Sequence, residues 1–129
     1  MKRLIIAASV AATLTLASVA LAAVTLHATY KTTITSSAAG GALKGAWTIK
    51  FEHPNYTVTD NGAVVIHGKY TIKGTTITFR DKTGKDVCPG AGKYTINKTG
   101  TTLTFTRISD TTACLGRETV LAGTFTKAG

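Results

Sequence analysis

One amphipathic segment occurs twice in this chain and strongly restricts the folds that it can adopt. Residues 68–79 read GKYTIKGTTITF, and residues 92–105 read GKYTINKTGTTLTF. In both copies apolar and polar side chains alternate on either side of a glycine-containing turn, which is the pattern of a β-hairpin. Because a single hairpin cannot bury its apolar face alone, the repeat predicts several hairpins that pack together.

The same alternation continues through most of the chain after residue 23. Trp47, Ile49 and Phe51 share one face of a strand, with polar side chains between them. Short turn signals, such as HPN at residues 53–55 and DNG at residues 60–62, separate the strands. Neighbouring strands are therefore expected to pair as antiparallel hairpins.

These patterns predict an all-β chain, most simply closed as an antiparallel up-and-down (meander) β-barrel. The length after residue 23 allows roughly eight to ten strands, and closure removes the unpaired edges of an open sheet. An open sandwich is the competing architecture. Helical periodicity is weak, and only residues 36–44 and 110–117 could each form one loose helical turn.

The N-terminus has the pattern of an export signal. Lys2 and Arg3 precede an apolar run that ends in the small-x-small sequence ALA at residues 20–22. Hydroxyl residues within the run argue against the alternative of a transmembrane anchor. We expect a signal peptide over residues 1–22, one domain over residues 23–129, and a secreted, extracellular or periplasmic protein without a transmembrane anchor after cleavage.

The chain has two cysteines, Cys88 and Cys114. In an oxidising compartment an even pair is typical of a disulfide. A reactive thiol pair is the alternative, but the spacing is far from C-x-x-C and no histidine neighbours either residue. We therefore expect one disulfide between them.

Residues typical of enzymes and metal sites are sparse. The histidines lack zinc-motif spacing, no serine lies in a G-x-S-x-G elbow, and most acidic residues fall at turns, where aspartate caps the backbone. We expect no catalytic activity, no metal and no cofactor. The histidines are His27, His53 and His67, and the acidic residues are Glu52, Asp60, Asp81, Asp86, Asp110 and Glu118.

The chain is basic, with a formal net charge of +9. Such a charge gives a weak, salt-sensitive attraction to anionic surfaces. The lysines, however, are spread over polar strand faces and turns, where they keep a sheet soluble. We therefore expect no specific recognition of nucleic acid.

Six aromatic side chains fall on the apolar faces of the predicted strands. They could pack as an ordinary core, or they could line a cavity that holds a small apolar ligand. Buried tyrosine hydroxyls would then need hydrogen-bond partners, which a ligand or other side chains could provide. The six candidates are Trp47, Phe51, Tyr70, Phe79, Tyr94 and Phe105.

The motif Gly45-x-Trp47 at the start of an amphipathic strand resembles the G-x-W signature of the lipocalins and wider calycins. The DKTG turn at residues 81–84 followed by Cys88, and Cys114 before Gly116-Arg117, resemble lipocalin-like proteins secreted by bacteria. The resemblance implies an antiparallel barrel with room for a hydrophobic ligand. It also implies that an arginine packs across Trp47 and closes the barrel floor, with Arg117 as first candidate and Arg107 as second.

Two functions follow as hypotheses. The first is non-catalytic binding of a small, mostly apolar ligand inside the barrel of a monomer. The second is an interaction protein with a filled barrel, such as a secreted protease inhibitor or a cell-envelope adhesion module. That protein would act through the loops at residues 36–44, 82–91 and 109–117. The presence or absence of an interior cavity distinguishes the two.

Overall fold

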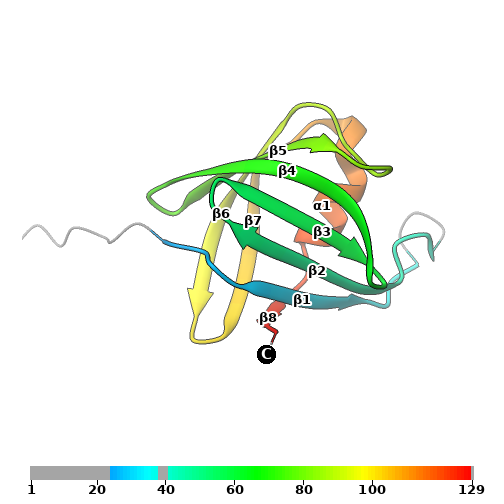
Figure 1. The fold of residues 1–129 in the computed structure, drawn as a ribbon, viewed down its shortest axis with the longest axis horizontal. Coiled ribbons are helices and arrows are strands. Elements are labelled where there is room, and N and C mark those ends of the chain that lie inside the picture. Colours follow the sequence, from blue (N-terminus) through cyan, green and yellow to red (C-terminus); the bar gives the residue numbers. More distant parts are fainter. Residues whose placement is uncertain (1–23, 38–40, 129) are drawn as a thin grey trace, which may run out of the picture.

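A computed structural model describes residues 24–37 and 41–128 of the chain (Figure 1). The predicted signal peptide, residues 1–22, lies outside these described residues and stays a prediction. Within the described ranges, no helix has the length and apolar character needed to cross a membrane.

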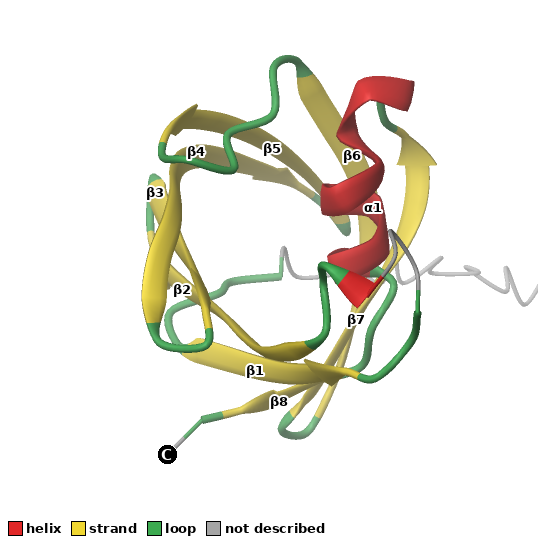
Figure 2. Ribbon diagram, turned by 90° about the vertical axis from the view of Figure 1, so that its right-hand side faces the viewer, coloured by secondary structure: helices red, strands yellow, loops and turns green. Residues whose placement is uncertain are grey.

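Eight antiparallel strands form a closed barrel in which each strand pairs with its neighbours in sequence. Figure 2 shows the ring that they make. This confirms the predicted up-and-down barrel, at the lower end of the expected number of strands. The strands are β1 (Thr29–Ile34), β2 (Gly45–Glu52), β3 (Asn55–Asp60), β4 (Ala63–Lys73), β5 (Thr76–Thr83), β6 (Ala91–Thr99), β7 (Thr102–Ser109) and β8 (Phe125–Lys127).

Strand β1 closes the barrel, because it pairs with β2 on one side and with β8 on the other. Its alternating side chains Tyr30, Thr32 and Ile34 are buried. Residues 29–34, which precede the G-x-W motif, are therefore part of the barrel wall.

The repeated sequence segments form the β4–β5 and β6–β7 hairpins. Their apolar side chains point inward and fill the barrel with aromatic rings that meet edge to face. The ring centroids of Phe51 and Tyr70 lie 5.2 Å apart, and Phe79 lies 5.9 Å from Tyr94 and 5.7 Å from Phe105. This aromatic layer is the core that holds the strands together.

The chain between β7 and β8 folds into more helix than the sequence suggested. A 3-10 helix, η2 (Thr112–Cys114), leads into an α-helix, α1 (Leu115–Leu121), where one loose turn was expected. Val120 and Leu121 are buried against the core. Only these two residues of α1 are buried, so the helix has too short an apolar stripe to give a clear helical period. Figure 2 shows α1 lying across one side of the barrel opening.

Candidate functional site

A cavity of about 420 Å³ opens at the end of the barrel that α1 partly covers. Strands β2 to β5 form its walls, and the loop that contains Lys85 and Asp86 forms one rim with α1. The apolar part of the lining includes Trp47, Ile49, Val58, Ile66, Phe79 and Leu121. The barrel interior is thus divided into an aromatic layer and a cavity between that layer and the end covered by α1.

The structure separates the six aromatic candidates into two groups. Trp47 and Phe79 line the cavity, and the Trp47 indole N–H donates a hydrogen bond to the Leu43 carbonyl at 2.8 Å, which fixes the ring. The other four lie outside the cavity lining, where they pack in the aromatic layer or, for Tyr94, also reach a buried aspartate. These four are Phe51, Tyr70, Tyr94 and Phe105.

Asp81 brings a carboxylate into the cavity wall. It follows Ile77 and Phe79 on the inward face of β5, and its side chain is 1% exposed. The Tyr56 hydroxyl donates a hydrogen bond to Oδ1, and the Cys88 backbone N–H donates one to Oδ2 at 2.9 Å. Burial is the larger cause and the neighbouring Asp81 the smaller cause of a raised pKa at Tyr56. The phenol therefore stays neutral and donates its proton in the hydrogen bond.

A second buried carboxylate, Asp110, forms a bidentate pair with Arg117 of α1. Arg117 Nε and Nη2 donate to the two carboxylate oxygens at 2.9 and 2.6 Å, and the Tyr94 hydroxyl donates to Oδ2 at 2.5 Å. Burial alone would raise the pKa of Asp110, but the hydrogen bonds from Arg117, Tyr94 and Thr111 outweigh it and lower the pKa.

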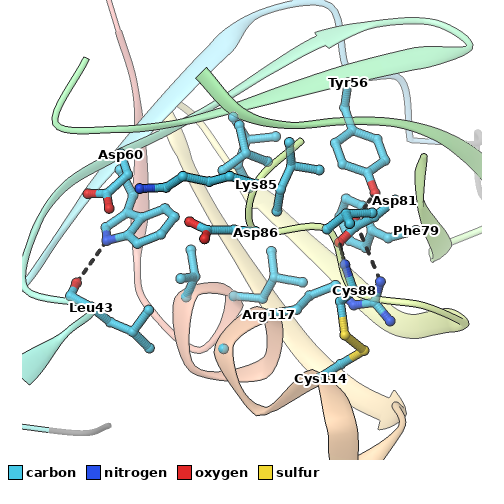
Figure 3. Close-up of a pocket in the computed structure, with 18 of the residues that line it drawn as sticks. Leu43, Tyr56, Asp60, Phe79, Asp81, Lys85, Asp86, Cys88, Cys114 and Arg117 are labelled. Carbon is cyan, nitrogen blue, oxygen red and sulfur yellow. Dashed lines mark hydrogen bonds and ion pairs between the residues drawn. A yellow bond between two sulfur atoms is a disulfide. The ribbon is translucent and has the colours of Figure 1, made fainter. Parts of the chain in front are cut away.

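The same contacts keep Arg117 charged and join the two aspartates. Burial alone would lower the pKa of Arg117, but Asp110 and Asp81 raise it. Arg117 Nη1 lies 3.6 Å from Asp81 Oδ1 (Figure 3). Burial and Asp110 also raise the pKa of Tyr94. One arginine, two aspartates and two tyrosines therefore form a continuous polar cluster at the cavity wall.

Glycines at the head of the repeated segments make room for this cluster. A Cβ atom on Gly92 would lie 2.6 Å from Asp110 Oδ2 and 2.9 Å from Arg117 Nε. A Cβ atom on Gly68 would collide with the Tyr56 ring and hydroxyl. The glycines are thus required for close approach of the buried polar side chains, in addition to starting their hairpins.

The expectation that these aspartates serve mainly as turn caps was wrong for Asp81 and incomplete for Asp110. Asp110 does accept a hydrogen bond from the Thr111 N–H at 2.8 Å, but its side chain is fully buried. The DKTG segment resembles a turn, yet β5 continues to Thr83. Alternate residues of a strand face the same side, so Asp81, two residues after Phe79 and four after Ile77, could have been placed inside the barrel from the sequence.

Arg117 lines the same cavity as Trp47. The packing of Arg117 across Trp47 that the resemblance implies, with closure of the barrel floor, stays a prediction. Its polar contacts go to Asp110, Asp81 and the Gly90 carbonyl. Arg107, the second candidate, is exposed and pairs with Glu118 at 3.3 Å.

The predicted disulfide between Cys88 and Cys114 is present. It links the loop before β6 to η2, and both cysteines line the cavity. The covalent link therefore holds the rim loop against the adjacent helical segment (Figure 3).

The histidines lie away from this site. His27 and His53 border a groove of about 240 Å³ at the opposite end of the barrel, beside Tyr70. His67 is exposed on β4. No group of three or more histidine, cysteine, aspartate or glutamate side chains suited to a metal ion occurs in the described part of the chain.

Two polar atoms at the cavity have no hydrogen-bond partner. Within the described residues, the buried side-chain atoms in this state are Asp60 Oδ1 and Arg117 Nη1, and both residues line the cavity. Buried polar atoms are normally paired. Their meeting at one cavity marks the place where a bound molecule could complete the hydrogen bonding.

Comparison of the chain with protein-family models, with curated proteins and with solved structures finds no match.

Proposed function

We propose that this protein is a non-catalytic binding protein that holds one small, mostly apolar molecule in the barrel cavity. The observation that carries the proposal is the cavity of about 420 Å³ with Trp47, Phe79 and aliphatic side chains in its lining. Small-molecule sites have volumes of about 300–1,000 Å³ and combine apolar walls with a few polar groups. An eight-stranded barrel has room for one such ligand.

The resemblance to secreted lipocalin-like proteins supports the same function, because that resemblance implies a barrel with an interior ligand. Secretion belongs to the proposal, and the Cys88–Cys114 disulfide is compatible with an oxidising compartment. The alternative of a filled barrel that acts only through its loops is not favoured, since it requires a packed interior.

Trp47 provides a direct readout, because it is the single tryptophan of the chain and lines the cavity. We expect the neutral apolar probe N-phenyl-1-naphthylamine to quench Trp47 fluorescence by energy transfer, with saturation at one probe per chain. Native mass spectrometry of the mature protein should give the same stoichiometry. Absence of binding by both methods would overturn the proposal.

Gly116 allows a matched pair of variants. It lines the cavity from α1, and a Cβ atom added there meets no atom within 4 Å. Gly116→Phe should fill the opening and weaken probe binding by about tenfold or more, whereas Gly116→Ala should leave it intact and favour the helix by about 1 kcal/mol. Equal binding by the two variants would place the probe elsewhere.

A further inference from the structure

We infer that the ligand of this cavity is a cationic amine, with its ammonium group on Asp60 and its apolar body along Trp47 and Phe79. The inference rests on the proposed function, and it adds the chemical class of the ligand. Its first support is Asp60 Oδ1, which is shielded from solvent at the cavity and accepts no hydrogen bond from any described residue. A buried carboxylate oxygen without a donor is best satisfied by a charged donor.

The second support is the distribution of charge. Asp60, Asp81 and Asp86 all line this cavity, so half of the chain's six acidic residues gather there although its formal net charge is +9. Asp81 already receives hydrogen bonds and Asp86 is exposed. Asp60, which is half-buried, is therefore the one of these three carboxylates with an oxygen that is shielded from solvent and accepts no hydrogen bond from the described residues.

The third support is the neighbour of Asp60 across the sheet. Trp47 and Asp60 are register partners on β2 and β3, and both line the cavity. An ammonium bound to Asp60 thus lies beside the indole, and a cation over the face of a tryptophan is attracted by the ring. The fixed Trp47 indole and the carboxylate together favour a cation over a neutral head group.

Two cations also line the cavity, and neither provides a free anion site. Arg117 has a side chain that is 5% exposed, and its charge is already offset by Asp110 and Asp81. Lys85 is exposed, and Figure 3 shows its side chain reaching toward Asp60 from the rim. No described residue forms an ion pair with Asp60 within 4.0 Å, so a bound amine can occupy the position next to Asp60 and leave Lys85 to solvent.

The far end of the cavity adds a weaker preference. Figure 3 shows Asp60 at one end and the Arg117–Asp81 pair at the other. Arg117 Nη1 is buried and lacks an acceptor. Since its charge is already offset, a neutral oxygen such as a hydroxyl or carbonyl suits it better than a second anion. An amine whose far end carries such an oxygen should therefore bind more tightly than the plain amine.

The test uses three ligands with the same eight-carbon chain: octylamine, octan-1-ol and octanoate. Isothermal titration calorimetry with the mature protein should give octylamine an affinity at least about tenfold higher than either of the other two. Asp60→Asn should remove this preference and leave octan-1-ol binding unchanged within about threefold. Glu52→Gln is the charge-matched control, because Glu52 is exposed on the same strand as Trp47 and pairs with Lys50.

The outcomes separate this inference from the proposed function. Equal binding of all three ligands, or tightest binding of octanoate, would overturn the amine inference and leave the apolar binding site standing. Lack of binding by all three would overturn both. Lys85→Gln should strengthen octylamine binding, since it removes a competing cation, and a loss of affinity in this variant would contradict the inference. 8-Amino-octan-1-ol and 10-aminodecan-1-ol, compared with the matching alkylamines, test the far-end oxygen.

Discussion

At the scale of single residues, the hydrogen bonds around Arg117 explain how a barrel with a mostly apolar interior tolerates three charged side chains, Arg117, Asp81 and Asp110. Isolated buried charges are costly, and a pair is tolerated only when hydrogen bonds satisfy its remaining atoms. Asp110 has donors from Arg117, Tyr94 and Thr111, and Asp81 has donors from Tyr56 and the Cys88 N–H. Arg117 lines the cavity, and its Nη1 atom has no hydrogen-bond partner among the described residues.

This cluster predicts a specific sensitivity to acid. The pKa of Asp110 is lower in the folded protein than its ordinary value of 3.8, so the unfolded chain binds its proton first as the pH falls. The stabilisation from the Asp110 carboxylate is therefore complete above about pH 4 and is lost as the pH falls through the lowered folded pKa. Urea unfolding between pH 7 and pH 2.5 measures the loss.

The comparison variant for acid sensitivity is Asp110→Asn. It should be less stable than the wild type at pH 7, because Arg117 loses its charged partner, and the difference should shrink toward pH 2.5. Glu52→Gln, at an exposed surface pair, should follow the wild-type profile. A constant difference between Asp110→Asn and the wild type across this range would show that the carboxylate charge of Asp110 contributes nothing.

At the scale of elements, alternation and turn residues were sufficient to predict the strands, the hairpin repeat and the up-and-down order. The closing strand β8 is three residues long, and the alternation of β1 did not reveal its partner. Both depend on long-range pairing, which local patterns do not encode. The helix α1 was underestimated as one loose turn over residues 110–117 for the same reason: its position is set by the buried Val120 and Leu121 and by the Arg117–Asp110 pair.

The candidate site was predictable only in part. Trp47 and Phe79 were found because their apolar side chains share the strand period. Among the polar residues, Arg117 was named from the resemblance, but the interior roles of Asp81 and Asp110 were missed. An aspartate after a strand looks the same in sequence whether it caps a turn or points into a barrel. For Asp110 the deciding partner is Arg117, which belongs to a helix that the sequence predicted only as one loose turn.

The disulfide is the element-scale feature with the clearest energetic consequence. Cys88 and Cys114 are separated by 26 residues, and a loop of this length gives a loop-entropy stabilisation of about 3.5 kcal/mol. The double variant Cys88→Ala/Cys114→Ala should lose roughly this free energy of unfolding, as measured with urea. Reductant should bring the wild type to the level of the double variant and leave the variant unchanged. Wild-type unfolding that does not respond to reductant would contradict this expectation.

At the scale of the whole molecule, the barrel combines an end filled by aromatic side chains with an end that holds a cavity. The aromatic layer fills the barrel below Trp47, where Phe51, Phe79 and Phe105 meet their neighbours edge to face. Above it, the cavity is bounded by a loop and a short helix that one disulfide joins. Under the proposed function a ligand would enter on this side, and Phe79 is a side chain that the cavity and the aromatic layer share.

The weakest strand pairing in the barrel should be that of β8. This strand pairs with β7 and β1 through two residue pairs on each side, whereas β4 and β5 pair through seven. Burial of Phe125 opposes the opening of β8. Its side chain is fully buried, with its ring centroid 5.7 Å from that of Phe105, and exposing a phenylalanine costs about 1.5–3 kcal/mol. Local opening of β8 should therefore need less free energy than global unfolding, yet should remain a minor state.

Hydrogen exchange measures the local opening of β8 directly. The amides of Lys127 and Ala128, which donate to the carbonyls of Thr101 and Thr29, should exchange faster than the amides at the centre of the β4–β5 hairpin. Phe125→Ala should accelerate them further, because it removes the side chain that anchors β8 in the core. Val64→Ala, a truncation on the exposed face of β4, is the matched control and should leave the rates at Lys127 and Ala128 unchanged. Protection of β8 equal to that of the β4–β5 hairpin would mean that the barrel opens only as a whole, and would overturn the prediction of local opening at β8.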